Sequence, residues 1–333
     1  MNAQSSAFTT LDFSKIGRQV GYFSIPHSPH DDAWGSCRIP MAVIANGDGP
    51  TAILQGGNHG DEYEGPIVLG EIIRDLDPAS IQGRLIILPS VNANAVAAGK
   101  RISPVDSLNL NRCYPGDHGG TLTEQIAAYI TDCIYPIGDA FIDLHSGGTS
   151  LEFIPSAIIQ PTDDPEHTSR NVAAVKAFDA PLTVVVDNLG ETRTASATAV
   201  KAGLTTVGTE LAGAGTVNKE ALSICRRGIR NVLTHLGILD ETIDQQISLK
   251  NVLKVPGTEG LVFADDDGVF ESFHNLGDKV RKGEPAGQIH HLLTPDRPPQ
   301  VLHFSTGGIV YARRPLGRVS PGSCCLVIAV PET

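Results

Sequence analysis

The sequence predicts an α/β fold, with a mixed, largely parallel sheet and flanking helices, followed by a smaller all-β region. Apolar strand-like runs alternate with helical patterns between about residues 51 and 237, and such alternation is typical of a largely parallel sheet. After about residue 250 the pattern changes to short β runs separated by glycines. We therefore expect two domains, an α/β domain over residues 1–248 and an all-β domain, a barrel or sandwich, over residues 249–333.

The elements of the first half follow from local patterns. Residues 51–55 form an apolar run that ends at Gly56, and residues 64–76 carry apolar side chains at helical spacing. Thr121 and Glu124 have the spacing of a capping box. The predicted order is strands over 17–26, 36–46 and 51–55, a helix over 64–76, a strand over 84–90, a long loop over 93–120 and a helix from residue 122.

The alternation continues in the second half of the α/β region. Residues 139–148 predict a buried strand that ends in small residues, and residues 204–211 predict another apolar strand. Asn218 is a suitable N-cap for a helix that ends at Gly237. The remaining predicted elements are β structure over 153–161, a helix over 168–178, a strand over 183–187 and a short helix over 195–202. Sheets of this kind place their sites at the carboxyl ends of strands.

The composition excludes several classes of protein. The chain has 333 residues, with 25 Lys and Arg against 37 Asp and Glu, and a formal net charge of −12. This balance argues against nucleic acid or an anionic membrane surface as a partner. No secretory signal and no apolar run of about 20 residues is visible, so we expect a cytoplasmic protein. The six cysteines lack CxxC spacing and are expected to be free thiols. The sequence leaves the oligomeric state open, and a homo-oligomer is possible.

A candidate metal site lies at the ends of two predicted strands. His59 and Glu62 are three residues apart just after the first strand, and His145 ends a second strand 83 residues after Glu62. Imidazole nitrogens and a carboxylate suit zinc, and three ligands leave a fourth position for water. The alternative is a loop histidine beside a helix-favouring glutamate and a strand-end histidine with a structural role. The three residues together favour the metal.

Other polar residues are candidates for substrate binding and proton transfer. Arg112 offers a planar fork that matches a carboxylate, and Asn111 offers an amide donor beside it. Glu210 ends an apolar strand, where poor solvation would raise the pKa of a carboxyl group toward the range of a general base. The alternatives are an Asn-Arg pair at the surface and a solvated acid at the end of a strand. Asp143 shares a strand face with His145 and is either an orienting partner of that histidine or a structural acid.

These segments together resemble the succinylglutamate desuccinylase and aspartoacylase family, relatives of the zinc carboxypeptidases. The similarity covers most of residues 50–330, and the segments that carry it are GGNHGDEYEG, NLNR, FIDLHSGG and the strand that ends at Glu210. The resemblance implies a zinc-carboxypeptidase-like fold, with the β domain shaping the mouth of the site. It also implies one Zn²⁺ per chain, bound by His59, Glu62 and His145.

The resemblance implies roles for the other residues as well. Asn111 and Arg112 would bind the substrate carboxylate, and Glu210 would act as general base and acid. Arg101 corresponds to an arginine that polarises the scissile carbonyl in the family, although its spacing to Arg112 is longer here. Zinc would lower the pKa of its bound water, and the reaction would be hydrolysis of a linear amide.

The implied substrate is a small N-acyl amino acid. We expect an N-acetylated amino acid with one carboxylate and a side-chain amine, as in Nα-acetyl-2,4-diaminobutyrate of ectoine degradation, which would give acetate and the free amino acid. Asp187, Glu191 and Glu152 are candidates to face the amine. Arg193 is the candidate second cation for a substrate with two carboxylates, such as acetylaspartate or succinylglutamate.

Two other readings stay open. A zinc exopeptidase that removes a carboxy-terminal residue would use the same ligands and base, but it needs a long open cleft. A carrier or binding module built on the β domain belongs to a different class. The modifiable lysine motif of carrier domains is missing from the segment LGDKVRKGEPAGQI, which counts against that reading.

Overall fold

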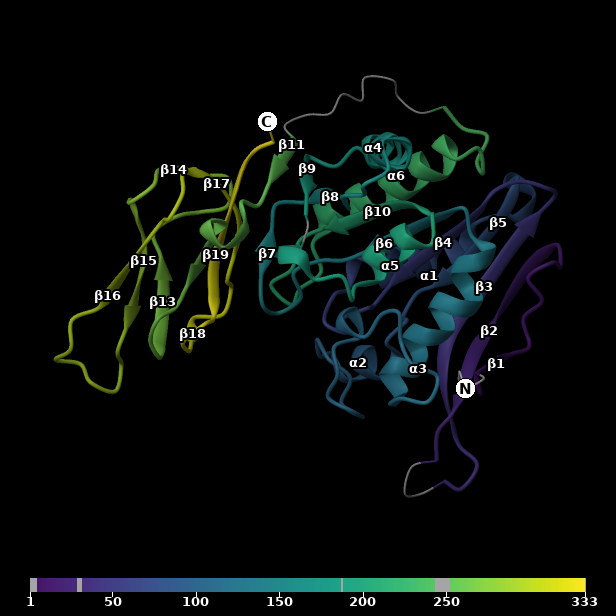
Figure 1. The fold of residues 1–333 in the computed structure, drawn as a ribbon, viewed down its shortest axis with the longest axis horizontal. Helices are drawn as coiled ribbons and strands as arrows, with labels where there is room; N and C mark the ends of the chain where they lie inside the picture. Colours follow the sequence, from purple (N-terminus) through teal and green to yellow (C-terminus); the bar gives the residue numbers. More distant parts are fainter. Residues whose placement is uncertain (1–4, 29–31, 187, 243–251, 333) are drawn as a thin grey trace.

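The computed structural model describes residues 5–28, 32–186, 188–242 and 252–332. Within these residues the strands form two sheets, one of 15 strands and one of four. The α/β part of the molecule lies beside the β-rich C-terminal part (Figure 1). The strands are β1 (Phe8–Thr9), β2 (Gly17–Pro26), β3 (Ser36–Asn46), β4 (Thr51–Gly56), β5 (Gly83–Leu88), β6 (Ala140–Leu144), β7 (Glu152–Phe153), β8 (Ser156–Ile159), β9 (Leu182–Val185), β10 (Thr205–Glu210), β11 (Val252–Lys254), β12 (Leu261–Phe263), β13 (Gly268–Ser272), β14 (Lys279–Val280), β15 (Pro285–His290), β16 (Gln300–His303), β17 (Gly308–Arg313), β18 (Arg318–Val319) and β19 (Cys324–Pro331).

The helices fall between these strands. They are α1 (Glu64–Asp75), α2 (Ala93–Ala98), α3 (Leu122–Tyr129), α4 (Pro165–Phe178), α5 (Ala195–Lys201) and α6 (Lys219–His235). Short 3-10 turns cover Pro78–Ser80, Leu110–Arg112, Tyr135–Ile137, Asn188–Gly190 and Gly257–Gly260, and a π turn covers Ile130–Ile134. No helix of the described residues is both long and apolar enough to cross a membrane.

The centre of the large sheet is parallel. The strand order is β1-β2-β3-β5-β4-β6-β10-β8-β9-β11-β19-β17-β14. Strands β5, β4, β6 and β10 are parallel neighbours, whereas β8 is antiparallel to β10 and parallel to β9. The mixed sheet that the sequence predicted is therefore present. The carboxyl ends of β4, β6 and β10 meet at one edge, and this edge carries the candidate site.

Helices cover both faces of the sheet because alternate side chains of each strand point to opposite faces. Leu54 and Ile142 belong to the core cluster that α1, α4 and α6 cover. Their neighbours Ile53 and Phe141 belong to the cluster that α3 and α5 cover. The central strands are thus buried on both sides, as the near-continuous apolar runs in the sequence indicate.

The structure corrects the predicted loop over residues 93–120. Helix α2 occupies the beginning of that segment: the side chain of Asn92 accepts from the backbone N–H of Ala95 at 3.4 Å, and Gly99 ends the helix with a φ of 57°. Six residues are too few to show a helical apolar period, so only the two caps could have indicated this helix. The predicted capping box of α3 is confirmed, since Thr121 N–H donates to Glu124 Oε2 at 2.7 Å.

The C-terminal residues form the all-β region that the sequence predicted. Strands β16, β15, β13 and β18 make the four-stranded sheet. A separate apolar cluster, which includes Phe270, Ile289 and Leu326, joins these strands to β12, β17 and β19 of the large sheet. Strand β11 pairs with both β9 and β19, so the large sheet continues into this region. The predicted domain boundary between residues 248 and 249 falls in 243–251, outside the described residues.

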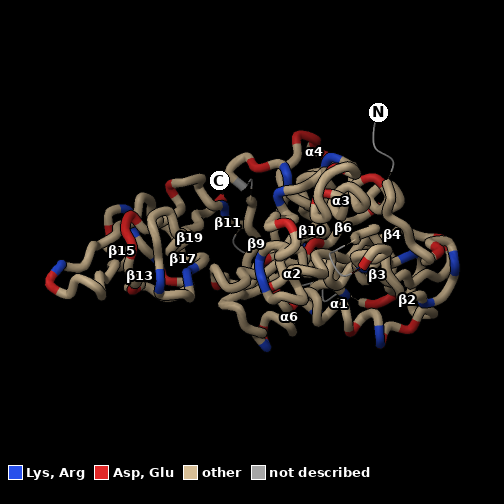
Figure 2. Tube along the Cα trace, turned by 90° about the horizontal axis from the view of Figure 1, so that it is seen from below, with Lys and Arg blue, Asp and Glu red and all other residues tan. Residues whose placement is uncertain are grey.

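Basic and acidic residues are mixed over the molecule. Lys and Arg are interspersed with Asp and Glu along the trace (Figure 2). All six cysteines are free thiols, as predicted.

Candidate active site

Three neighbouring strands bring the candidate residues together. His59 and Glu62 lie in the turn between β4 and α1, His145 directly follows β6, and Glu210 is the last residue of β10. Because β4, β6 and β10 are adjacent and parallel, residues far apart in the sequence meet at one edge.

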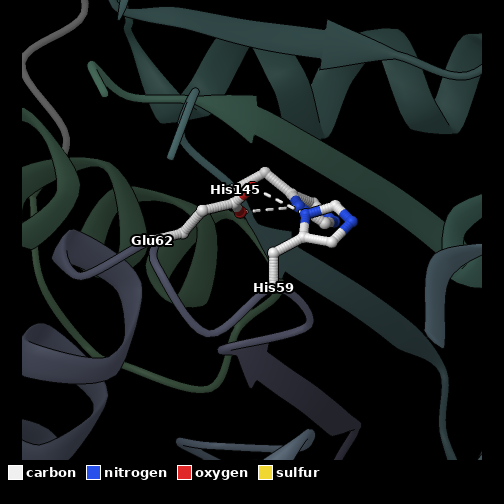
Figure 3. Close-up of side chains that lie close together, drawn as sticks. All are labelled: His59, Glu62 and His145. Carbon is white, nitrogen blue, oxygen red and sulfur yellow. Dashed lines mark hydrogen bonds and ion pairs between the residues drawn. The ribbon is translucent and has the colours of Figure 1, made fainter. Parts of the chain in front are cut away.

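His59, Glu62 and His145 form a compact cluster. Glu62 Oε1 lies 2.6 Å from His59 Nδ1, and Glu62 Oε2 lies 2.9 Å from His145 Nδ1 (Figure 3). His59 and Glu62 are each only 3% exposed, and the side chain of His145 is 11% exposed. One donor atom from each residue lies within 4.8 Å of the others. The spacing that the sequence suggested is therefore realised in three dimensions.

The other ring nitrogen of each histidine has its own partner. His145 Nε2 lies 3.0 Å from Asp143 Oδ2, and His59 Nε2 lies 3.2 Å from Asn109 Oδ1. Asp143 Oδ1 accepts from Gln55 Nε2 at 3.2 Å, so both of its oxygens are held. These contacts orient both imidazole rings with Nδ1 toward Glu62, as outer partners do for metal-binding histidines.

Burial and charge set the protonation of the cluster. Burial lowers the pKa of His59, although Glu62 opposes this change. Burial also favours the neutral form of His145, but the carboxylates of Asp143 and Glu62 outweigh it and raise its pKa well above the usual value. For Glu62 burial is outweighed by the two histidines, so its pKa is lowered.

The cluster fits a metal ion. Two imidazole nitrogens and a carboxylate oxygen converge, and a buried carboxylate between two rings needs positive charge beside it. This donor set is typical of catalytic zinc sites with three protein ligands.

Glu210 lies beside the cluster with a free carboxylate oxygen. Its Oε2 is buried and has no hydrogen-bond partner among the described residues. Burial and the negative charge of Glu62 raise the pKa of Glu210 to about 8. A carboxylate with this pKa and an unused oxygen can exchange a proton with a bound molecule.

The pocket in front of the cluster is small. It has a volume of about 170 Å³ and includes His59, Glu62, His145 and Glu210 in its lining. The other lining residues are Arg101, Asn111, Arg112, Ser146, Gly147, Ser150, Leu151, Phe153, Ile158, Gln160, Thr194, Ser196, Gly208 and Thr209. Pockets for drug-sized ligands have roughly 300–1,000 Å³, so this pocket suits a smaller molecule.

Cationic and amide side chains line one part of the pocket. Arg101 Nη1 lies 3.6 Å from Glu62 Oε1, which places this guanidinium beside the cluster. Asn111 Oδ1 accepts from the backbone N–H of Ala195 at 2.9 Å, so its NH₂ group is left as a donor. Arg112 donates to the backbone carbonyl of Asn111 at 2.7 Å, and its Nε lies 3.9 Å from Glu191 Oε2. All three residues that the sequence indicated are at the pocket.

Glu152 and Glu191, which were expected to face a substrate amine, are paired with arginines and are not among the residues that line the pocket. Glu152 forms an ion pair with Arg313 at 2.8 Å. Glu191 receives two hydrogen bonds from the Arg193 guanidinium, at 2.7 and 3.0 Å. The charge of Arg193 is therefore balanced by Glu191, and Arg193 is not among the residues that line the pocket. Asp187 lies outside the described residues.

Sequence reasoning missed several residues of the site. Asn109 was not singled out, although it belongs to the NLNR segment and contacts His59. Asp61 accepts from the backbone N–H and the hydroxyl of Thr149, at 2.7 and 2.8 Å, and so joins the loops that follow β4 and β6. Gln160 and Ser196 line the pocket without any local motif. Of these residues, only Asn109 and Asp61 could have been found from the sequence, because they lie inside the segments NLNR and GGNHGDEYEG.

Known proteins share the fold and the sequence. Residues 48–236 match the family model described as the succinylglutamate desuccinylase/aspartoacylase catalytic domain. The N-alpha-acetyl-L-2,4-diaminobutyric acid deacetylase of Halomonas elongata is 38% identical over 320 residues, which cover 96% of this chain and 94% of that protein.

Solved structures agree with this assignment. A product-bound structure of the ectoine utilization protein EutE (DoeB) from Ruegeria pomeroyi is 38% identical, with a TM-score of 0.94, and covers 98% of this chain and 100% of that chain. A succinylglutamate desuccinylase/aspartoacylase structure from Rhodobacter sphaeroides is also 38% identical, with a TM-score of 0.91 and the same coverage. The chain belongs to the succinylglutamate desuccinylase/aspartoacylase family.

Proposed function

We propose that this protein is a zinc-dependent deacylase that hydrolyses the amide of an N-acetylated amino acid. The substrate is Nα-acetyl-L-2,4-diaminobutyrate, which gives acetate and 2,4-diaminobutyrate in ectoine degradation. The observation that carries the proposal is the His59, Glu62 and His145 cluster beside the unpartnered oxygen of Glu210, in one small pocket. The name of the Halomonas relative supports the choice of substrate.

The cluster would hold one zinc ion per chain. His59 and His145 would bind through Nδ1, since their Nε2 atoms have other partners, and Glu62 would supply a carboxylate oxygen. A bound Zn²⁺ activates water and polarises the substrate carbonyl. The chain's own residues then provide binding and proton transfer.

Glu210 is the group that moves the proton. Its free Oε2 accepts a proton from the attacking water and returns it to the leaving amine. Arg101, with its guanidinium beside Glu62, is placed to donate to the carbonyl oxygen as negative charge develops there. A preorganised donor of this kind contributes roughly 3–4 kcal/mol to transition-state stabilisation.

Asn111 and Arg112 hold the substrate carboxylate. The NH₂ group of Asn111 and the unused donors of Arg112 are both available at the pocket wall. A charge-assisted contact from arginine to a carboxylate is directional as well as strong. The carboxylate thereby fixes the position of the amide beside Glu210.

Residues 1–248 would form the catalytic domain, with residues 249–333 restricting the pocket. Strand β17 pairs with β7, with Ala312 opposite Phe153, and Phe153 lines the pocket. A pocket of about 170 Å³ supports a small substrate rather than the peptide of an exopeptidase. The free thiols support a reducing compartment, so we place the enzyme in the cytoplasm.

A substrate panel tests the proposal on one preparation of zinc-loaded enzyme. We expect kcat/KM for Nα-acetyl-2,4-diaminobutyrate to exceed that for acetylaspartate and succinylglutamate by at least tenfold, about 1.4 kcal/mol of transition-state discrimination. Arg193 is already paired with Glu191 and cannot clamp a second carboxylate without breaking that pair. A tenfold preference for either dicarboxylate would instead identify a desuccinylase or aspartoacylase. Release of a carboxy-terminal residue from peptides at a higher kcat/KM would identify a carboxypeptidase.

A further inference from the structure

Part of the pocket is lined by residues of β10, β8 and α5, and this part adjoins His145 through Asp143, which contacts both His145 and Ser196. Glu210 and Gly208 of β10 lie opposite Ser156 and Ile158 of β8. Gly208, Ile158, Gln160 and Ser196 all line this part of the pocket, and we call these four residues the side-chain subsite.

The backbone conformation of Gly208 does not require glycine. It lies inside a strand paired on both sides, opposite Asp143 and Ile158, and its φ is not positive. A Cβ at this position would lie 3.2 Å from Ile158 Cβ and would take up space in the pocket. Glycine inside a strand often marks the close approach of a ligand. The missing side chain therefore leaves room for part of the substrate.

The polar groups of the subsite present hydrogen-bond acceptors. Ser196 Oγ donates its proton to Asp143 Oδ2 at 3.4 Å, so its lone pairs are left for a donor. The Gln160 carboxamide makes no hydrogen bond to another described residue, and its oxygen is free to accept. Ile158 supplies an apolar wall beside them.

The charges around the subsite favour a cation. Asp143 lies directly behind Ser196, and the arginines among the described lining residues are Arg101 and Arg112. Arg101 lies beside Glu62, and Arg112 lies beside Asn111 and Glu191. A second carboxylate in the subsite would meet the lone pairs of Ser196 and Gln160 and the carboxylate of Asp143, with no arginine of the described residues in contact with these groups.

We propose that the side-chain subsite binds the ammonium-bearing side chain of the substrate. The methylene groups pack on Ile158 over Gly208, and the ammonium donates to Gln160 Oε1 and Ser196 Oγ. This assignment rests on the proposed deacylase function and names the residues that select its substrate. Gln160 is thus a specificity-determining residue that acts on the substrate side chain and not on the reacting amide.

The first test compares two substrates that differ only in the amine. We expect Gln160→Leu to lower kcat/KM for Nα-acetyl-2,4-diaminobutyrate by about 10- to 100-fold, the effect of losing a hydrogen bond to a charged group. For Nα-acetyl-2-aminobutyrate, the same variant should change kcat/KM by less than about threefold. Gln288→Leu, in the four-stranded sheet, is the matched control and should change neither value. An equal loss for both substrates, or no loss for either, would overturn the assignment.

The second test fills the space at Gly208. We expect Gly208→Ala to lower kcat/KM for Nα-acetyl-2,4-diaminobutyrate at least tenfold more than for N-acetylglycine, which has no side chain to place there. An equal reduction for both substrates would show that the added methyl group disturbs Glu210 rather than the subsite, against the proposal.

The third test separates this inference from the catalytic proposal. Calorimetry measures binding of the product 2,4-diaminobutyrate and of 2-aminobutyrate to the protein without any turnover. We expect wild type to bind 2,4-diaminobutyrate at least tenfold more tightly and Gln160→Leu to lose that preference. If wild type hydrolyses no acetylated amino acid but keeps this binding preference, the proposed function fails and the subsite stands. Equal binding of the two products by wild type would overturn the subsite.

Discussion

Asp143 Oδ2 lies 3.0 Å from Nε2 of His145, two residues further along the chain, while Nδ1 of the same ring points to Glu62. The contact arises because residues two apart on an extended segment point to the same side, and His145 directly follows β6. Asp143 thereby fixes which ring nitrogen is presented to Glu62.

This contact predicts the behaviour of Asp143→Asn. An amide in place of the carboxylate removes the negative charge behind the imidazole, so zinc affinity should fall by about 10- to 100-fold. Competition with a fluorescent zinc chelator measures the dissociation constant. Asp132→Asn, at an exposed residue that pairs with His118, is the control. Affinity within twofold of wild type would mean that Asp143 has only a structural role.

Loss of a histidine ligand should be more severe. We expect His59→Ala and His145→Ala to lower the zinc content well below one ion per chain, because each removes one of three protein ligands. Chelation of wild type should abolish hydrolysis, and added Zn²⁺ should restore it. Elemental analysis after gel filtration measures the metal, with His290→Ala in the C-terminal sheet as control. Full metal and activity in either ligand variant would exclude this ligand set.

Glu210→Gln should keep zinc and the fold but lose catalysis. The amide matches the shape of the side chain and cannot accept a proton, so kcat should fall by about 100- to 10,000-fold. Steady-state kinetics on metal-replete protein provides the measurement, and Glu271→Gln, at an exposed residue of β13, is the control. Activity within threefold of wild type would mean that another group activates the water.

Arg112→Ala should act mainly on binding. Loss of a charge-assisted contact to the substrate carboxylate should raise KM by about 10- to 100-fold with a smaller change in kcat. Arg112→Lys should restore only part of the affinity, because lysine cannot form the bidentate contact. If KM stays unchanged in the alanine variant, Arg112 does not bind the substrate.

The stability of the metal-free protein should depend on pH through Glu210. The pKa of Glu210 is raised from 4.5 to about 8, so the folded state holds a proton in this interval that the unfolded chain releases. Its contribution to the free energy of unfolding is therefore full below pH 4.5 and is lost as the pH rises through 8. Between pH 5 and pH 8, wild type should lose at least about 1 kcal/mol relative to Glu210→Gln in urea unfolding. A difference between the two proteins that stays constant with pH would contradict this assignment.

The sequence by itself determined the alternation of strands and helices, the all-β C-terminal region and the candidate site residues. Periodicity and caps are local, so they can be recognised without the partners of each element. His59 and Glu62 are close in the chain, and the position of His145 at a strand end could be anticipated because parallel strands share one site edge.

Only the tertiary structure decided which strands are neighbours and in which direction they run. Strand β8 is antiparallel to β10, which brings Ile158 opposite Gly208, and α5 places Ser196 against Asp143. The pairing of Glu152 with Arg313 likewise depends on the antiparallel contact between β7 and β17, which places these two residues opposite each other. The physical reason is that strand order, strand direction and loop packing are set by long-range burial of both sheet faces. A strand that is buried on both faces has the same apolar sequence pattern whichever strands lie beside it, so its sequence does not reveal its neighbours.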